Sequence, residues 1–234
     1  MLICGLQKLS LLDYPEKLAA TIFTGGCNMR CPFCHNALLV TRVSESETID
    51  ESEILNFLKK RTGLLDGVCI TGGEPRLQND LADFIIEIRK LGFLIKLDTN
   101  GTFPEKLAAL LDMGLIDYVA MDIKNSPEKY PLTVGLPNFD SAPVFESAAI
   151  LMNSPVPYEF RTTLVRELHT FDDIETIGRV LSGAKSYYLQ NFEDSGDLVG
   201  SLGVSPVFSA FSIPDAEHCK DILEKYIRNV RIRN

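Results

Sequence analysis

Cys27, Cys31 and Cys34 lie in one short loop, with three residues between the first two cysteines and two between the last two. Three thiolates can bind three irons of a [4Fe–4S] cluster, and the fourth iron then stays open to a ligand that is not protein. A metal site closed by protein ligands is usually structural, whereas an open coordination position usually serves chemistry. The loop therefore predicts a redox centre that binds its substrate or cofactor directly.

The charge balance and the N-terminal residues argue against several other classes of protein. The 234 residues contain 32 Asp and Glu against 23 Lys and Arg, a net charge of −9, which argues against a nucleic-acid-binding protein. No apolar run is long enough to span a bilayer. The first residues also lack the charged start and long apolar middle of a secretion signal. We expect a cytoplasmic protein without nucleic-acid or membrane partners.

The other cysteines, Cys4, Cys69 and Cys219, are isolated in the sequence. Because cytosolic thiols stay reduced, we expect them to be small buried hydrophobes rather than disulfide partners or ligands of a second cluster. Zinc is the alternative metal for the cysteine loop, with His35 as the fourth ligand. Cys34 and His35 are adjacent, however, so chelation of one ion by both would be strained. We therefore favour the iron–sulfur cluster.

Short apolar runs rich in β-formers alternate with segments of helical spacing along the whole chain. Strands are predicted at residues 18–24, 67–71, 94–97, 118–121, 158–165, 187–190 and 230–232. Repeated βαβ units predict an α/β protein with a parallel sheet. Because a closed eight-fold barrel typically takes ~250 residues, this chain fits a partial, open (β/α)6 TIM-like barrel better. We expect one domain that spans residues 1–234.

Polar residues follow most of the predicted strands. The first strand leads into the cysteine loop, and the polar segments after four later strands are Gly72–Pro75, Asp98–Gly101, Asp122–Lys124 and Gln190–Asn191. In parallel α/β folds, ligands bind at the carboxyl ends of the strands. Glycines, carboxylates, an amine and three thiols would therefore meet on one rim, which suits a zwitterionic, ribose-bearing cofactor.

Several of these motifs resemble a known family. The three-cysteine motif with Phe33 before its last cysteine, together with Gly72-Gly73-Glu74-Pro75, resembles the radical S-adenosylmethionine (radical SAM) superfamily. Further motifs resemble the glycyl-radical-enzyme activating enzymes, and within them the activating proteins of anaerobic ribonucleoside-triphosphate reductase. These motifs are Asp13-Tyr14-Pro15, Cys34-His35-Asn36, Asp98-Thr99-Asn100-Gly101 and Met121-Asp122-Ile123-Lys124. The resemblance extends from about Leu9 to Gln190.

The resemblance implies roles for the residues of the cysteine loop. Cys27, Cys31 and Cys34 would bind three irons of one [4Fe–4S] cluster. The backbone carbonyl of Phe33 would meet the adenine amino group of S-adenosylmethionine (SAM). His35 belongs to the same motif and is counted with Phe33 and Cys34 among the expected cofactor-binding residues.

The resemblance also assigns the strand-end residues to SAM. Gly72, Gly73 and Glu74 would bind the methionine ammonium of SAM. Asp98 and Asp122 lie where similar activases gather a monovalent cation beside the SAM carboxylate. Lys124 would approach that carboxylate or the ribose, and Gln190 stands near where some activases carry a SAM-contacting histidine. These positions complete the expected cofactor site.

The implied activity is that of an oxidoreductase, a radical SAM activating enzyme. One electron, from a donor such as flavodoxin or ferredoxin, would cleave SAM reductively to a 5′-deoxyadenosyl radical. That radical would abstract a glycine Cα hydrogen from a partner glycyl radical enzyme. No acid–base residue is required beyond the cluster and SAM.

Two other functions stay open at this point. One is a small-molecule radical SAM enzyme of the 7-carboxy-7-deazaguanine synthase type, although similar enzymes tend to have an acidic residue where this chain has His35-Asn36. The other is a non-catalytic zinc or electron-transfer module. The sequence also leaves open whether Arg161, inside a predicted strand, is a structural partner of a carboxylate or a functional residue. Residues 126–143, with their prolines, are expected to form a long irregular loop.

Overall fold

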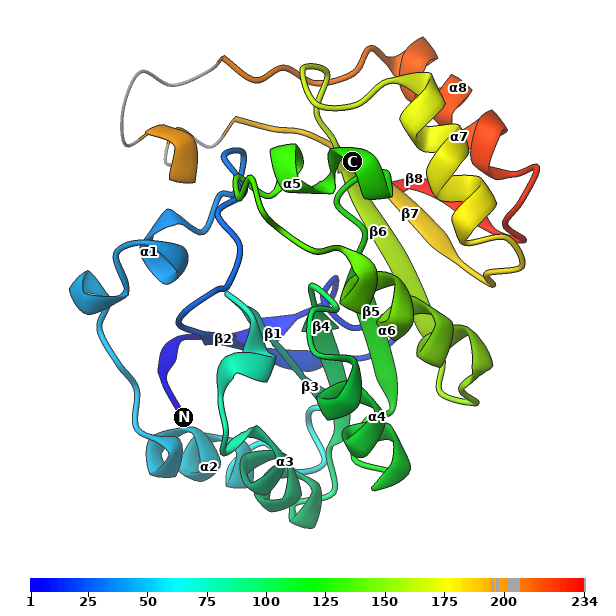
Figure 1. The fold of residues 1–234 in the computed structure, drawn as a ribbon. Helices are drawn as coiled ribbons and strands as arrows, with labels where there is room; N and C mark the ends of the chain where they lie inside the picture. The colour runs from blue at the N-terminus through cyan, green and yellow to red at the C-terminus, as the bar shows by residue number, and fades with distance from the viewer. Residues whose placement is uncertain (195, 197, 202–206, 234) are drawn as a thin grey trace.

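The computed structural model describes residues 1–194, 196, 198–201 and 207–233. In this part of the chain, eight strands form one sheet in which each strand pairs with its neighbours in chain order (Figure 1). The strands are β1 (Ile3–Ser10), β2 (Ala19–Thr24), β3 (Gly67–Gly72), β4 (Leu94–Thr99), β5 (Tyr118–Asp122), β6 (Tyr158–Leu164), β7 (Tyr187–Asn191) and β8 (Val230–Arg233).

Helices connect most of the strands, and the longer ones lie on the outside of the curved sheet (Figure 1). The α-helices are α1 (Ala37–Val40), α2 (Glu51–Lys59), α3 (Leu81–Lys90), α4 (Pro104–Asp112), α5 (Tyr130–Thr133), α6 (Ala142–Asn153), α7 (Phe171–Val180) and α8 (Ile213–Leu223). The 3-10 segments are η1 (Val43–Glu45), η2 (Pro75–Leu77), η3 (Pro127–Lys129) and η4 (Val199–Ser201). Among the described residues, no helix combines the length and apolarity needed to cross a membrane.

The strand pairing confirms the expected open, TIM-like α/β fold. Strands β2 to β8 pair in parallel through six successive crossovers, which agrees with a partial barrel of about six units. Strand β1 pairs antiparallel with β2, and β1 and β8 form the two edges of the sheet. The barrel is therefore open between β1 and β8 in the described part of the chain.

The strand β1 is absent from the sequence-based prediction. Most of its residues are only half buried or exposed, and its pairing with β2 is interrupted by two register shifts. A strand of this kind lacks the regular alternation that marks a half-buried strand in the sequence. Its position becomes evident only once β2 is in place as its partner.

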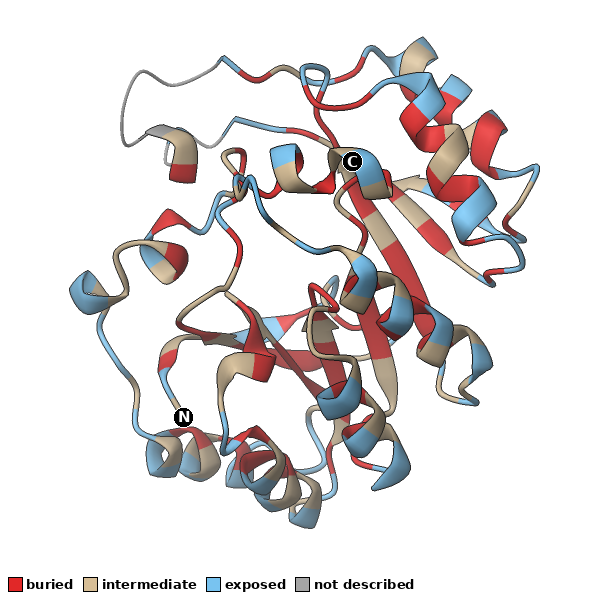
Figure 2. Ribbon diagram, viewed as in Figure 1, coloured by how far each residue is buried: buried red, intermediate tan, exposed pale blue. Residues whose placement is uncertain are grey.

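The strand register separates an apolar outer face of the sheet from a polar inner face. Successive residues of a strand point to opposite faces. On the inner face, Cys69 lies beside Lys96, and Asp122 lies beside Arg161. The buried apolar residues that alternate with these side chains include Ile22, Val68, Ile70, Ile95, Leu97, Val119, Met121, Phe160 and Leu189. They form a core with the helices, which Figure 2 shows as a concentration of buried residues on the strands.

Local sequence signals explain where the helices begin and end. The Asp50 side chain accepts a hydrogen bond from the backbone of Ser52 and so caps the start of α2. Thr170 and Asp173 form a reciprocal capping box at the start of α7. Gly92 follows α3 with a φ of 89°, a conformation that favours glycine at the end of a helix.

The segment expected to be an irregular loop, residues 126–143, is more ordered than predicted. It contains η3 and α5, and α6 begins at Ala142. The reason is Tyr130, which is fully buried and stacks on Phe139 with 5.6 Å between the ring centroids. This aromatic contact holds the segment against the core. It thereby also holds in place the residues that directly follow β5.

Candidate active site

A cavity of about 270 Å³ lies at the carboxyl ends of the parallel strands. It is lined by Cys27, Met29, Cys31, Phe33, Cys34, His35, Asn36, Val40, Thr71, Gly72, Gly73, Asp98, Thr99, Asn100, Asp122, Lys124, Arg161, Thr163 and Gln190. The lining includes almost every candidate residue that the sequence analysis selected, so the strand-end segments do meet on one rim. Glu74 is the one candidate that the lining omits.

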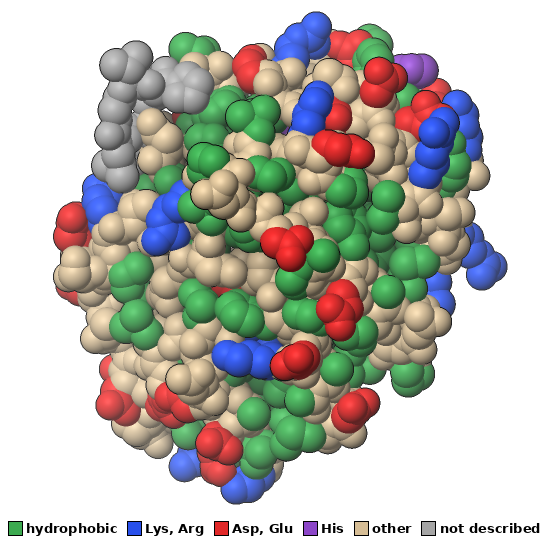
Figure 3. Space-filling view, in the orientation of Figure 1, with side chains coloured by type: hydrophobic (Ala, Val, Ile, Leu, Met, Phe, Trp, Pro, Cys, Tyr) green, Lys and Arg blue, Asp and Glu red, His purple; other side chains and the backbone are tan. Residues whose placement is uncertain are grey.

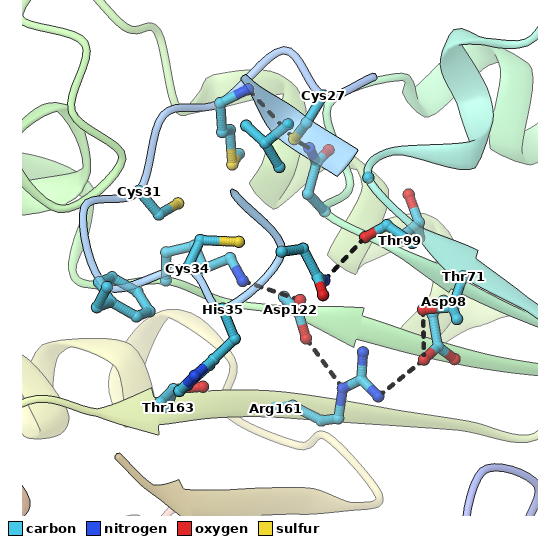
Figure 4. A pocket seen from close by; sticks show the side chains of 18 of the residues that line it. Cys27, Cys31, Cys34, His35, Thr71, Asp98, Thr99, Asp122, Arg161 and Thr163 are labelled. Atoms are coloured by element: carbon cyan, nitrogen blue, oxygen red, sulfur yellow. Dashed lines mark hydrogen bonds and ion pairs between the residues drawn. The ribbon is translucent and has the colours of Figure 1, made fainter. Parts of the chain in front are cut away.

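The three cysteine side chains point into this cavity from a loop with a fixed backbone (Figure 4). The Cys34 N–H donates to the carbonyl of Cys31 at 3.0 Å. Within the same loop, the Arg30 side chain donates to the Cys27 carbonyl at 2.7 Å. The Arg30 N–H donates to the carbonyl of Val134, just after α5, so the ordered segment behind the loop supports it.

The surroundings of the thiols suit an iron–sulfur cluster. The Met29 N–H and the Asn100 side-chain amide donate to the Cys27 sulfur at 3.4 and 3.9 Å, and hydrogen bonds to cysteine sulfur are one way in which a protein tunes a cluster. Burial raises the pKa of the Cys31 thiol to about 12 and also raises that of Cys27. Without a metal, the Cys27 and Cys31 thiols are therefore protonated at neutral pH, and metal binding would displace their protons.

The geometry bears on the zinc alternative as well. In the described part of the chain, no three His, Cys, Asp or Glu side chains come close enough to hold a single metal ion. A [4Fe–4S] cluster takes its cysteines on different irons, so its ligands need not converge on one point. The His35 ring stacks on Phe192, with 5.6 Å between the ring centroids, and thus lies along the wall of the cavity.

Gly72 and Gly73 bring β3 against the start of the cysteine loop. Gly72 has a φ of 114°, and a Cβ on Gly73 would lie 1.9 Å from the carbonyl oxygen of Gly26. The Glu74 N–H donates to that same carbonyl at 2.8 Å. Only glycine permits this approach, and both glycines consequently present backbone to the cavity.

Glu74 is placed differently from what the sequence analysis expects. Its side chain is fully buried, does not line the cavity, and accepts hydrogen bonds from the Arg76 N–H, the Thr99 hydroxyl and the Asn100 N–H at 3.0, 2.9 and 2.6 Å. Burial raises the pKa of the Glu74 carboxyl to about 7, although these hydrogen bonds act to lower it. Asn100, which donates to Glu74, also contacts the Cys27 sulfur with its side chain. Glu74 therefore holds Asn100 in the cavity wall, and its own carboxylate does not reach into the cavity.

Five charged side chains form an alternating row across β4, β5 and β6. Lys96 pairs with Asp98. Arg161 bridges Asp98 and Asp122 at 3.1 and 2.9 Å (Figure 4). Lys124 pairs with the other oxygen of Asp122 at 2.9 Å. Burial acts to raise the pKa of Asp122, but Arg161 and Lys124 lower it to about 2. Arg161 is therefore both a partner of buried carboxylates and a residue of the cavity wall.

Three residues of this arrangement escaped the sequence analysis as site residues: two contact the Lys124 backbone, and the third is a member of the row. The Lys124 N–H donates to the hydroxyl of Tyr130 at 3.0 Å, and the Lys124 carbonyl lies 2.8 Å from Nε2 of buried His169. Lys96 is almost fully buried on the inner face of β4. A lysine within an apolar strand, and a histidine between a strand and a helix, are the only signals of these contacts in the sequence.

A second cavity, of about 550 Å³, adjoins the first. The two linings share His35, Asp98, Arg161, Thr163 and Gln190. The second cavity extends to Leu12 and Asp13, which follow β1, and to Arg233 at the end of β8. It therefore spans the opening between the two edges of the sheet and joins the cofactor cavity to the side of the barrel.

Comparisons with known proteins agree with this site. A family model described as the radical SAM superfamily matches residues 21–179. A protein of Methanocaldococcus jannaschii that carries the provisional name glycyl-radical enzyme activating enzyme is 34% identical, over 99% of this chain and 95% of that protein. The pyruvate formate-lyase-activating enzyme of Listeria monocytogenes is 30% identical, over 62% of this chain and 61% of that enzyme.

A solved structure gives the same result for the fold. A domain of pyruvate-formate lyase-activating enzyme from Bacteroides vulgatus superposes with a TM-score of 0.57 at 16% identity, over 72% of this chain and 99% of that domain. The chain belongs to the radical SAM superfamily and, within it, to the family of glycyl-radical-enzyme activating enzymes. It is an enzyme whose cofactors are a [4Fe–4S] cluster and SAM, and the cysteine loop and its cavity fit both.

Proposed function

We propose that this enzyme installs a glycyl radical on a separate protein, and that this protein is an anaerobic ribonucleoside-triphosphate reductase. The observation that carries the proposal is the second cavity, which leads from the cofactor cavity to the open side of the barrel. A small substrate needs an enclosed pocket, whereas an extended segment of another protein needs a lateral entrance. The choice of reductase rests on the motifs at Asp13-Tyr14-Pro15 and Cys34-His35-Asn36.

The charges of the second cavity support a peptide substrate. Its basic side chains, Lys96, Arg161 and Arg233, are all engaged by Asp98, Asp122 or Glu159. A small anionic substrate would have to compete with these ion pairs for a basic partner. A glycine-containing main chain needs hydrogen-bonding groups instead, and Thr163, Gln190 and Asn191 offer such groups at this wall.

The residues of the chain bind and orient the reactants. When bound, the cluster and SAM supply reductive cleavage of a C–S bond and a 5′-deoxyadenosyl radical that abstracts hydrogen. Cys27, Cys31 and Cys34 would hold the cluster by three irons. The backbone of Gly72 and Gly73 would meet the methionine end of SAM.

The other assignments extend along the rest of the cavity wall. The positive charges of Lys124 and Arg161 would face the SAM carboxylate, and the Phe33 carbonyl would accept from the adenine amino group. His35 and Gln190 belong to both linings and would separate SAM from the partner. No side chain is assigned a proton-transfer step.

The proposal includes a cytoplasmic location and a small redox protein, flavodoxin or ferredoxin, as electron donor. Arg30, His35 and Asn36 are exposed, so the cysteine loop lies at the surface where a donor can approach. The face of the molecule in Figure 3 shows basic and acidic side chains interspersed with apolar ones. Electron-transfer encounters use small, transient interfaces, so an exposed loop offers enough surface for this contact.

The proposal is tested by electron paramagnetic resonance. The reconstituted, reduced enzyme is mixed anaerobically with SAM and the candidate reductase, and a glycyl radical signal should appear on the reductase. The control is a reductase variant in which the radical-bearing glycine is replaced by alanine, which should give no signal. Absence of a signal with the intact reductase, while SAM is consumed, would contradict this choice of partner.

A further inference from the structure

The alternating row of charged residues, Lys96–Asp98–Arg161–Asp122–Lys124, occupies the place where the resemblance implies a monovalent cation. The row contains three positive and two negative side chains. Lys96 is 2% exposed, and the side chains of Asp98 and Arg161 are each 14% exposed. Four of its members, Asp98, Asp122, Lys124 and Arg161, line the cofactor cavity. Figure 4 labels three of them, Asp98, Asp122 and Arg161, at its wall. The row therefore carries a surplus positive charge at the cavity wall.

Each carboxylate oxygen in this row already has a cationic partner. The Asp98 oxygens contact Lys96 Nζ and Arg161 Nη1, and the Asp122 oxygens contact Arg161 Nε and Lys124 Nζ. Monovalent and divalent hard cations bind through several oxygen ligands. A cation between Asp98 and Asp122 would have to displace Arg161 and would be repelled by both lysines. The residues present thus do not fit the implied cation.

Lys96 is fixed in this arrangement by the strand register. It lies opposite Cys69 of β3 and Tyr118 of β5, on the inner face of the sheet. Its ammonium reaches only the Asp98 carboxylate and the Cys69 sulfur, which is 3.8 Å away, among the hydrogen bonds of the described residues. Burial acts to lower the pKa of Lys96, but the charge of Asp98 raises it above its ordinary value. Lys96 therefore stays charged at neutral pH.

We propose that Lys96 and Arg161 take the place of the monovalent cation in this enzyme. Arg161 supplies the positive charge for the SAM carboxylate, and Lys96 is a positioning residue that neutralises Asp98 and leaves Arg161 free to serve both aspartates. Binding of SAM is consequently independent of K⁺ and Na⁺. The inference concerns the cofactor site alone and does not depend on the identity of the protein partner.

The test measures SAM affinity at constant ionic strength in KCl, NaCl and choline chloride. For the cluster-loaded wild-type protein, the dissociation constant from titration calorimetry should change less than twofold among the three salts. Lys96→Met removes the charge, keeps most of the side-chain length, and leaves one oxygen of Asp98 without a cationic partner. SAM binding by this variant should be at least tenfold weaker in choline chloride than in KCl.

A second measurement does not need the cluster or SAM. Thallium-205 resonance reports binding of Tl⁺, a stand-in for K⁺, to the cofactor-free protein. The wild-type protein should show no saturable Tl⁺ site, and Lys96→Met should show one. Lys96→Gln, which keeps a hydrogen-bond donor without the charge, replaces Lys96→Met if circular dichroism shows that the methionine variant does not fold.

The control is Lys220→Met, which removes a lysine that bridges Glu217 and Glu224 on α8, outside both cavities. It should behave as the wild-type protein in all three salts. The proposal is overturned if wild-type SAM affinity falls tenfold or more in choline chloride, or if the wild-type protein binds Tl⁺ at a saturable site. It is also overturned if a folded Lys96 variant stays independent of the salt.

Discussion

The Glu74 carboxylate accepts a hydrogen bond of 2.6 Å from the backbone N–H of Asn100, and both residues are buried. The Asn100 side chain in turn contacts the Cys27 sulfur and Asn28. The glycine-rich motif after β3 is thereby connected to the cysteine loop through the segment after β4. The role of Glu74 is to hold these three strand ends in register with one another.

The buried Glu74 predicts a specific pH dependence of stability. Burial raises the pKa of its carboxyl from 4.5 to about 7, so the folded protein binds its proton more tightly than the unfolded chain. The contribution to stability is present below pH 4.5 and is lost as the pH rises through 7, by up to about 3 kcal/mol. Glu74→Gln removes this titration.

Urea unfolding of the cofactor-free wild-type protein and of Glu74→Gln, from pH 5 to 8, measures this dependence. Other carboxylates titrate equally in both proteins, so the difference between them isolates Glu74. The free energy of unfolding of the wild-type protein should fall relative to that of the variant as the pH rises. A difference that is constant over the range, or that grows in favour of the wild-type protein, contradicts the assigned environment.

Iron binding should depend on the cysteine loop and on no other cysteine. Anaerobic reconstitution should give about four irons per chain. Cys31→Ser should lose the cluster and SAM cleavage, because only two thiolates of the loop remain. The control, Cys219→Ser in α8, also changes a buried cysteine and should retain the iron. Tight zinc binding without iron uptake by the wild-type protein would rule out the cluster.

Lys124 should contribute to SAM binding without contributing to cluster assembly. Its ammonium lines the cofactor cavity and is not among the expected iron ligands. A hydrogen bond to a charged group is worth about 1.5–3 kcal/mol, so Lys124→Met should weaken SAM binding by roughly tenfold to a hundredfold. The iron content should stay at the wild-type level. Titration calorimetry compares the cluster-loaded variant with the wild-type protein. Equal SAM affinity of the two would contradict a role of Lys124 in SAM binding.

Gly73 should tolerate no side chain. A Cβ at this position would lie 1.9 Å from the Gly26 carbonyl oxygen, so Gly73→Ala must shift the start of the cysteine loop. We expect a loss of about 1–3 kcal/mol in the free energy of unfolding, a typical cost of overpacking, and reduced cluster content. In the matched control, Gly5→Ala, the nearest atom to the new Cβ is 3.4 Å away, and stability should change little. Equal iron content in both variants would show that the approach of Gly73 to Gly26 is not needed.

The sequence predicts the seven parallel strands well because most of them are short apolar runs that end at polar or glycine residues. It also predicts the composition of the cofactor cavity, since the carboxyl ends of parallel strands necessarily meet. It does not predict the direction of Glu74, because a turn of the backbone after Gly73 decides whether that carboxylate faces the cavity or the core.

The row of charged residues could not be predicted for a related reason. Lys96 and Arg161 are distant in the sequence, and only the register of β4, β5 and β6 brings both to Asp98. A single lysine in an apolar strand carries no information about its partner. Tyr130 gives a similar case, since its contact with Lys124 requires the folded α5 segment.

The most direct test of the account follows the abstracted hydrogen atom. The reduced enzyme is incubated anaerobically with SAM and a candidate reductase that carries deuterium at the glycine Cα, and the 5′-deoxyadenosine product is examined by mass spectrometry. The account predicts one deuterium in 5′-deoxyadenosine and a glycyl radical on the reductase. Unlabelled 5′-deoxyadenosine with every glycyl radical enzyme of the same organism, together with label transfer from a small heterocycle, would contradict it.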